Sequence, residues 1–146
     1  MASNLIARTG ATAPVLFAVL ACLSGRALVQ APADTAVRLP RAVLADGQPL
    51  GAGAYAVRLS DAPVTPVVGQ APDGAHWVEF VQAGQVKGRE IATVVTAADL
   101  KAAGAVSRPP SAGAARVDLL KGGDYLRVWI NRAGTQYLIH LAVAGR

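Results

Sequence analysis

The segment that decides the fold is ARVDLLKGGDYLRVWINRAGTQYLIHLAV, residues 115–143. Apolar and polar side chains alternate along three stretches of it, which is typical of β-strands with one buried face. The pair Gly122 and Gly123 tolerates positive φ and therefore predicts a tight turn between the first two strands. RAGT, residues 132–135, predicts a four-residue loop before the third strand. The segment is therefore expected to form three antiparallel strands.

These two turns predict the register of the three strands. The first turn places Asp118 opposite Arg127, and the second places Arg127 opposite His140. A slip of one residue would exchange the two faces, so the register that separates apolar from polar side chains is the expected one. Its core face consists of Val117, Leu119, Leu126, Val128, Ile130, Tyr137, Ile139 and Leu141.

The opposite face of these strands is the candidate ligand-binding surface. An aromatic ring among hydrogen-bonding groups can stack on a sugar ring or anchor a protein partner. A second interpretation is that the connector AVSRPPSAGAA, residues 105–115, or another strand covers Trp129 and that the charges neutralise one another. Both interpretations remain open from the sequence. The candidate residues are Arg116, Asp118, Tyr125, Arg127, Trp129 and His140.

The rest of the chain predicts an all-β fold. Alternating apolar residues occur in AYAVRLS (54–60), HWVEFVQ (76–82) and GREIATVV (88–95), with shorter candidates in RAVLADG (41–47) and TPVVG (65–69). Only TAADLKAAG, residues 96–104, has a helical pattern, with Thr96 as its cap and Gly104 as its stop. We expect a single antiparallel β-sandwich or small barrel of seven to eight strands, with one short helix near residues 97–103.

The hairpin WVEFVQAGQVKGREI, residues 77–91, allows two registers. A two-residue turn at residues 83–84 sets Glu79 beside Glu90, whereas a three-residue turn pairs Glu79 with Arg89. Like charges opposite one another are destabilising, so we expect the second register.

The N-terminus has the pattern of a secretory signal peptide. Arg8 supplies a positive charge, and residues 10–23 are apolar but fewer than the roughly 20 that span a bilayer. A small-x-small cleavage site ends at Ala33. The expected organisation is a signal peptide over residues 1–33 and a β-domain over residues 34–146, in a secreted or periplasmic protein.

Cys22 offers an alternative to cleavage after Ala33. It ends VLAC, residues 19–22, which looks like a bacterial lipobox, and lipidation there would give a lipoprotein on the cell envelope. Contact with a membrane is expected only in that case. The domain itself contains no cysteine, so no disulfide or thiolate nucleophile is expected.

One stretch carries a resemblance to other proteins. DGQPLGAGAYAVRL, residues 46–59, resembles the L-x-A-G-x-Y-x-V pattern with which a strand opens in small exported β-domain proteins of soil bacteria. The resemblance implies an exported β-domain and carries no known activity. The matching residues are Gly47, Leu50, Ala52, Gly53, Tyr55 and Val57.

Charge and motif content narrow the function classes. The formal net charge is +5, but Lys and Arg are scattered, so no nucleic-acid partner is expected. The serines follow no nucleophile motif, and His76 and His140 have no metal-ligand spacing. We therefore expect no catalytic residue, no metal and no cofactor.

The expected function is an exported, non-catalytic binding module whose ligand is a glycan or a protein, such as an envelope protein. One alternative is a structural or assembly component of the cell envelope, anchored through Cys22. A minor alternative is a small hydrolase that uses His76 or His140.

Overall fold

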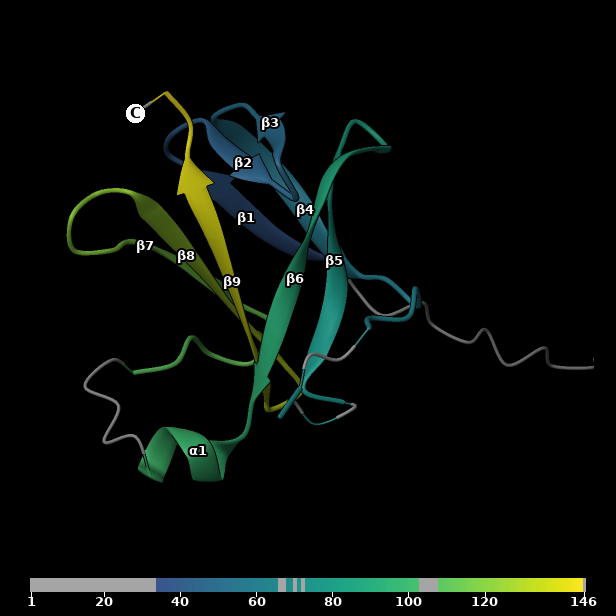
Figure 1. Ribbon diagram of the computed structural model, residues 1–146, viewed down its shortest axis with the longest axis vertical. Helices are drawn as coiled ribbons and strands as arrows, with labels where there is room; N and C mark the ends of the chain where they lie inside the picture. The colour runs from purple at the N-terminus through teal and green to yellow at the C-terminus, as the bar shows by residue number, and fades with distance from the viewer. Residues whose placement is uncertain (1–33, 66–67, 70, 72, 103–107, 146) are drawn as a thin grey trace, which may run out of the picture.

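The computed structural model describes residues 34–65, 68–69, 71, 73–102 and 108–145. The expected signal peptide, Cys22 and Gly104 lie outside the described residues. The described part of the chain contains one helix and nine strands (Figure 1). These are β1 (Thr35–Leu39), β2 (Val43–Ala45), β3 (Gln48–Leu50), β4 (Gly53–Leu59), β5 (Ala75–Gln82), β6 (Gln85–Val95), α1 (Ala97–Ala102), β7 (Ala115–Leu119), β8 (Tyr125–Arg132) and β9 (Thr135–Val143).

Seven strands form one antiparallel sheet that curls into a nearly closed barrel, in the order β7-β8-β9-β6-β5-β4-β1. Because every neighbouring pair is antiparallel and the number of strands is odd, β1 and β7 run in the same direction. They lie close together, and no backbone pairing joins them among the described residues. The all-β prediction is confirmed, and of its two architectures the barrel is the one observed.

The short hairpin of β2 and β3 fills the place where β6 and β9 separate. β9 pairs with β6 through Gln136–Ile139 and then with β2 through Ala142 and Val143. Leu50 packs so closely on β6 that a Cβ on Gly88 would lie 2.8 Å from its Cδ1. Any larger residue at position 88 would therefore force the Leu50 side chain to shift. The hairpin lies at the opposite end of the barrel from α1 (Figure 1).

The barrel interior is the hydrophobic core. Tyr55 points into it, as the sequence predicts, where its ring packs edge-on against Phe80 and its hydroxyl donates to the Gly51 carbonyl at 2.9 Å. Inward residues alternate with exposed ones along β1 and β2. The core consists of Val37, Leu39, Val43, Ala45, Leu50, Tyr55, Val57, Val78, Phe80, Ala92, Leu126, Val128, Ile130, Ile139 and Leu141.

The last three strands have the predicted register, but their turns differ from the prediction. Arg132 pairs with Thr135, so the expected four-residue loop is a two-residue turn at Ala133 and Gly134, with φ of 50° and 93°. Two consecutive positive φ values match the twist of a hairpin. The rest of the register is unchanged, because Arg132 and Thr135, which were expected in the loop, form one additional strand pair.

The Gly-Gly turn is also built differently from the prediction. Gly122 and Gly123 both have positive φ, at 97° and 77°, as a tight turn requires. The turn hydrogen bond, however, runs from the Gly123 N–H to the Leu120 carbonyl at 2.9 Å. The loop is therefore longer than two residues, and the strand register is unchanged.

The β5–β6 hairpin contains both alternative registers. Val81 pairs with Val86 across a two-residue turn at residues 83–84, yet Glu79 pairs with Arg89. A β-bulge between Phe80 and Val81 shifts the pairing by one residue. The expected pair of Glu79 with Arg89 is confirmed, whereas the expected three-residue turn is wrong.

Two further differences concern the ends of elements. Thr96 caps α1, as predicted: its hydroxyl accepts from the Asp99 N–H at 3.2 Å and donates to the Asp99 carboxylate at 2.7 Å. The TPVVG candidate is not observed as a strand where it is described, since Val68 and Gly69 form a turn. β1 and β3 are strands that the alternation did not identify.

Candidate functional site

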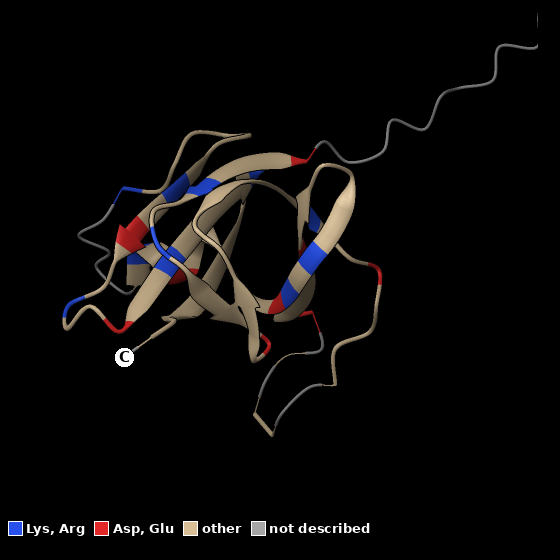
Figure 2. Cartoon of the chain, turned by 90° about the horizontal axis from the view of Figure 1, so that it is seen from above, with Lys and Arg blue, Asp and Glu red and all other residues tan. Residues whose placement is uncertain are grey.

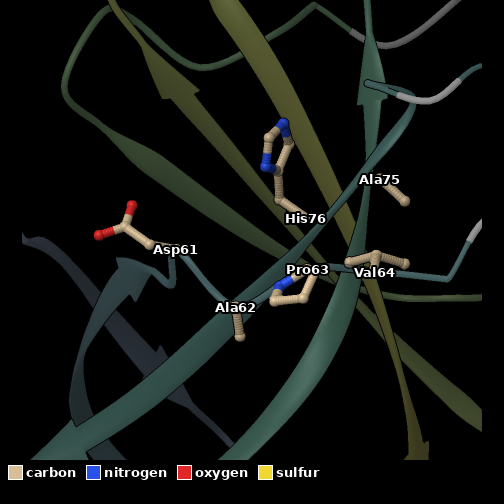
Figure 3. A pocket seen from close by; sticks show the side chains of 6 residues that line it. All are labelled: Asp61, Ala62, Pro63, Val64, Ala75 and His76. Carbon is tan, nitrogen blue, oxygen red and sulfur yellow. The ribbon is translucent and has the colours of Figure 1, made fainter.

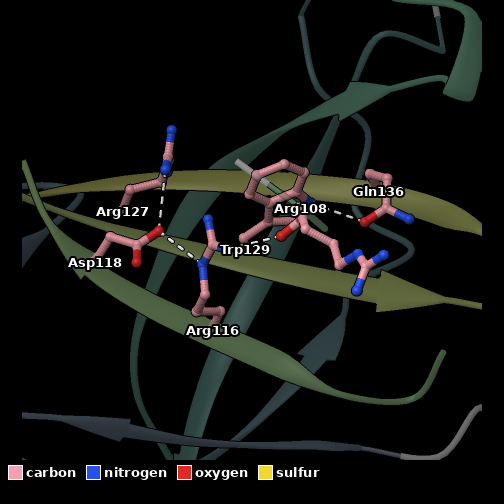
Figure 4. Close-up of polar contacts among 6 residues, drawn as sticks. All are labelled: Arg108, Arg116, Asp118, Arg127, Trp129 and Gln136. Carbon is pink, nitrogen blue, oxygen red and sulfur yellow. Dashed lines mark hydrogen bonds and ion pairs between the residues drawn. The ribbon is translucent and has the colours of Figure 1, made fainter. Parts of the chain in front are cut away.

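The candidate surface lies on the outer face of β7, β8 and β9. The register places Arg116 opposite Trp129, Asp118 opposite Arg127, and Arg127 opposite His140. Four of the six candidate residues, Arg116, Asp118, Arg127 and Trp129, form one connected cluster (Figure 4). His140 lies next to this cluster, and Tyr125 lies two residues before Arg127 on β8.

Trp129 is buried although it lies on the outer face. Only 2% of its surface is exposed. The guanidinium carbons of Arg116 and Arg127 lie 5.1 and 5.4 Å from the centre of its ring. Its indole N–H donates to the Gln136 side-chain oxygen at 2.8 Å, which satisfies its one polar atom. The ring therefore has almost no surface left on which a sugar could stack.

The connector before β7 is bonded to two neighbours of this tryptophan. Arg116, which is opposite Trp129, donates from Nη1 to the Arg108 carbonyl at 2.7 Å (Figure 4). Asn131, two residues after Trp129 on β8, donates from Nδ2 to the Pro110 carbonyl at 2.8 Å. For Trp129 the structure matches the covered interpretation of the two that the sequence left open.

One carboxylate serves both arginines. Arg116 Nε and Arg127 Nη2 each donate to the same Asp118 oxygen at 3.0 Å, as the two dashed lines in Figure 4 show. Burial alone would raise the pKa of Asp118. The hydrogen bonds from Arg127 and Arg116, and their positive charges, outweigh it, so the Asp118 pKa lies below its ordinary value.

Tyr125 and His140 remain exposed on this face. Half of the Tyr125 surface is exposed. Partial burial of the imidazole and the positive charge of Arg127 both lower the pKa of His140 below its ordinary value, because each disfavours the protonated ring. At neutral pH, His140 is therefore mainly an uncharged group that has one N–H donor and one acceptor nitrogen.

Two exposed residues near His140 were not predicted from the sequence. Leu44 on β2 pairs with Ala142, which pairs on its other side with Tyr125, so the three form one cross-strand row. Ile91 precedes Ala92, whose pair with Ile139 is the last before β6 and β9 separate, so Ile91 lies just beyond the paired segment, on the same outer face as His140. The alternation in RAVLADG indicates an outward Leu44, but no local signal indicates that β2 pairs with β9.

A second feature is an open hollow of about 370 Å³ at one end of the barrel (Figure 3). Among the described residues that line it, Asp61 and His76 are the ionisable ones, and their side chains do not point toward each other. The His76 ring contacts Tyr137 edge-on, with the ring centres 6.0 Å apart. His76 and His140, the two residues of the hydrolase alternative, therefore lie in separate places. The hollow is lined by Asp61, Ala62, Pro63, Val64, Ala75 and His76.

Three observations bear on other ligand classes. The described residues contain no group of three His, Cys, Asp or Glu side chains placed to hold a metal ion. Within the same part of the chain, no helix has the length and apolar character needed to cross a membrane. Lys and Arg are spread over several strands and loops and alternate with Asp and Glu (Figure 2).

Comparisons of the chain with protein-family models, with curated proteins and with solved structures find no match. The resemblance to exported β-domains of soil bacteria stays a prediction.

Proposed function

We propose that this protein is an exported, non-catalytic module that binds another protein through the outer face of its barrel. The binding surface, which we call the outer patch, consists of Leu44, Ile91, Tyr125 and His140. The observation that carries the proposal is that the first three are apolar or aromatic, exposed by 36%, 39% and 50%, and gathered on one side of the sheet.

The outer patch has the properties of an interface centre. Tyrosine offers a large contact area with few rotatable bonds, so little side-chain entropy is lost on binding. Neighbouring exposed apolar side chains on a rigid sheet favour a protein partner over solvent. The residues beneath and beside the patch are fixed, because Val128 and Ile139 are fully buried in the core.

A protein partner fits this surface better than a glycan does. Sugar binding by stacking requires an exposed aromatic face, and Trp129 is almost completely buried, with two arginines over its ring. Tyr125 is the exposed aromatic residue of this face, and it lies in one cross-strand row with the apolar side chains of Leu44 and Ala142.

The export part of the proposal is supported by residues 1–33, with their charged start, apolar centre and small-x-small end. Mass spectrometry of the native protein tests it. A mature N-terminus at Asp34 supports a soluble exported domain. A lipidated Cys22 supports the envelope-anchored alternative, and an intact Met1 contradicts both.

The binding part is tested by photo-crosslinking in the native host. A photoreactive residue at Tyr125 should give a discrete crosslinked protein, whereas the same residue at exposed Ala54 on β4 should not. The product should disappear when Leu44→Asp is added, with the fold checked by circular dichroism. Equal products from residues 54 and 125, or a product unaffected by Leu44→Asp, would contradict the proposal.

A further inference from the structure

The polar side of the outer patch carries more positive than negative charge. Two guanidinium groups, those of Arg116 and Arg127, share one oxygen of Asp118 at 3.0 Å each. One carboxylate therefore compensates two cations, and His140 lies immediately beside them, opposite Arg127. An ion pair with unequal charges leaves a local positive potential that attracts an anionic group.

Arg127 is the residue at which this excess is greatest. Its Nη2 is engaged by Asp118, but its Nε is buried and has no hydrogen-bond acceptor within the described residues. The buried Nε is out of a partner's reach, but the Arg127 side chain is 24% exposed, and a partner's carboxylate can approach that exposed part.

The acidic side chains on the other side of β9 already have partners. Asp46 forms an ion pair with Arg89 at 3.4 Å. Glu90 accepts a hydrogen bond from the Asp46 N–H at 2.8 Å and another from the Ile91 N–H at 3.0 Å. Neither carboxylate forms an ion pair with Arg127 or His140 in these contacts, so neither compensates the second cation of the cluster.

We infer that the partner is an acidic protein surface that places a carboxylate against Arg127 and His140 and an apolar or aromatic side chain against Tyr125 and Leu44. The inference rests on the proposed function and specifies the partner of the same patch. Charged and apolar groups lie side by side here, because the row of Arg127 and His140 is adjacent to the row of Tyr125 and Ala142. A guanidinium with an uncharged imidazole beside it offers several N–H donors to one carboxylate.

Three small probe molecules test separately how a negative charge and an aromatic ring contribute to binding at the outer patch. Phenylacetate carries both groups, phenylacetamide has the ring without the charge, and acetate has the charge without the ring. NMR titrations of isotope-labelled protein would follow the Arg127 side-chain N–H, the His140 ring and the Tyr125 ring. We expect saturable shifts of all three with phenylacetate, and roughly tenfold weaker binding of phenylacetamide because a charge-assisted hydrogen bond is lost.

Matched variants make the test specific. His140→Ala changes an exposed side chain and should weaken phenylacetate binding severalfold, and Arg127→Gln should abolish its preference over phenylacetamide. Arg58→Gln is the control, because Arg58 is exposed and already paired with Glu79 at 2.7 Å. It should leave the titration unchanged.

The outcomes distinguish the two proposals. If phenylacetamide binds as tightly as phenylacetate, the acidic partner is contradicted, and the patch as a protein-binding surface is retained. If acetate alone reproduces the phenylacetate shifts, or if the shifts occur equally at Arg58, the result is only general ion binding, and the inference is overturned. The crosslinking experiment tests the patch itself without reference to charge.

Discussion

The barrel carries two tryptophans on its outer face, and their surroundings differ. Trp77 on β5 has the Arg89 guanidinium 4.5 Å from its ring centre, and Trp129 on β8 has two arginines slightly farther away. Trp77 is nevertheless half-buried, whereas Trp129 is almost completely buried. Contact with arginine therefore does not account for the burial of Trp129.

The difference comes from what lies around each ring. Trp129 has a side-chain acceptor, Gln136, and it lies beside a connector that is held by Arg116 and Asn131. The arginine over Trp77 is itself more than half exposed. Trp129 is therefore packed on the outer face much as a core residue is packed inside the barrel. Trp77 is packed like an ordinary surface residue.

The largest expected effect is on the two tryptophans themselves. Trp129→Ala should lower the free energy of unfolding by about 3–5 kcal/mol, as for other large buried aromatic residues. Trp77→Ala should lower it by only about 1–2 kcal/mol, because less apolar area is lost from burial. Urea denaturation of both variants measures this. Equal losses would show that the two sites are equivalent after all.

The cover over Trp129 can be loosened without changing its ring. Asn131→Ala removes the bond to the Pro110 carbonyl and the acceptor for the Gly134 N–H, and should lower the free energy of unfolding by about 1–3 kcal/mol. In a Trp77→Phe background, Trp129 fluorescence should become more accessible to acrylamide. Thr135→Ala, at an exposed residue of the same hairpin, is the control and should leave quenching unchanged.

The ion pairs near the two tryptophans should respond differently to acid. The Asp118 pKa is lowered in the folded state, so the unfolded chain binds more protons as the pH falls. Its stabilising contribution is complete above the ordinary carboxyl pKa of about 3.9 and is lost as the pH falls through the lowered value. Asp118→Asn should therefore cost about 1 kcal/mol at neutral pH and make the acid limb less steep.

Glu79→Gln, which removes the exposed pair with Arg58, is the matched change beside Trp77. It should cost less than about 0.5 kcal/mol at neutral pH. Thermal unfolding between pH 2 and 7, followed by circular dichroism, measures both variants. If Glu79→Gln changed the acid limb more than Asp118→Asn does, the ion pair of Glu79 would be the stronger one, which contradicts the prediction.

The last comparison concerns the turns of the hairpins that carry the two tryptophans, where a gain in stability is expected. Ala83 and Ala133 both have φ of 50°, a conformation that alanine tolerates poorly and asparagine accepts more readily. Ala83→Asn and Ala133→Asn should each stabilise the fold by about 0.5–1 kcal/mol. Ala54→Asn, within a strand, should not stabilise it. Thermal shifts of the three variants provide the comparison.

The sequence predicted local pairing well, because local pairing depends on turns and alternation. The pairs of Asp118 with Arg127 and of Arg127 with His140 follow from adjacent hairpins with one buried face. In the β5–β6 hairpin, the turn follows the two-residue register, whereas the pair of Glu79 with Arg89 follows the three-residue register. A single-register prediction there was bound to be incomplete.

The burial of Trp129 and the composition of the outer patch depend on non-local contacts. The connector is bonded to Arg116 and Asn131 through the backbone carbonyls of Arg108 and Pro110, and backbone carbonyls leave no pattern in the sequence. Leu44 reaches the patch because β2 pairs with β9, almost one hundred residues later in the chain. Alternation shows which side of a strand is exposed, but it does not show which strands become neighbours.

The parallel arrangement of β1 and β7 has a consequence for how the barrel moves. The other neighbouring pairs among the seven barrel strands are joined by backbone hydrogen bonds, whereas β1 and β7 lie close together without backbone pairing in the described part of the chain. Because no backbone hydrogen bond has to break between β1 and β7, the barrel is expected to open first between these two strands. Thermal fluctuations should therefore widen the barrel along this line without breaking a backbone hydrogen bond, and its amide protons should exchange with solvent earliest among the strands. The barrel is therefore expected to open and close between β1 and β7 and not to be a rigid, closed cylinder.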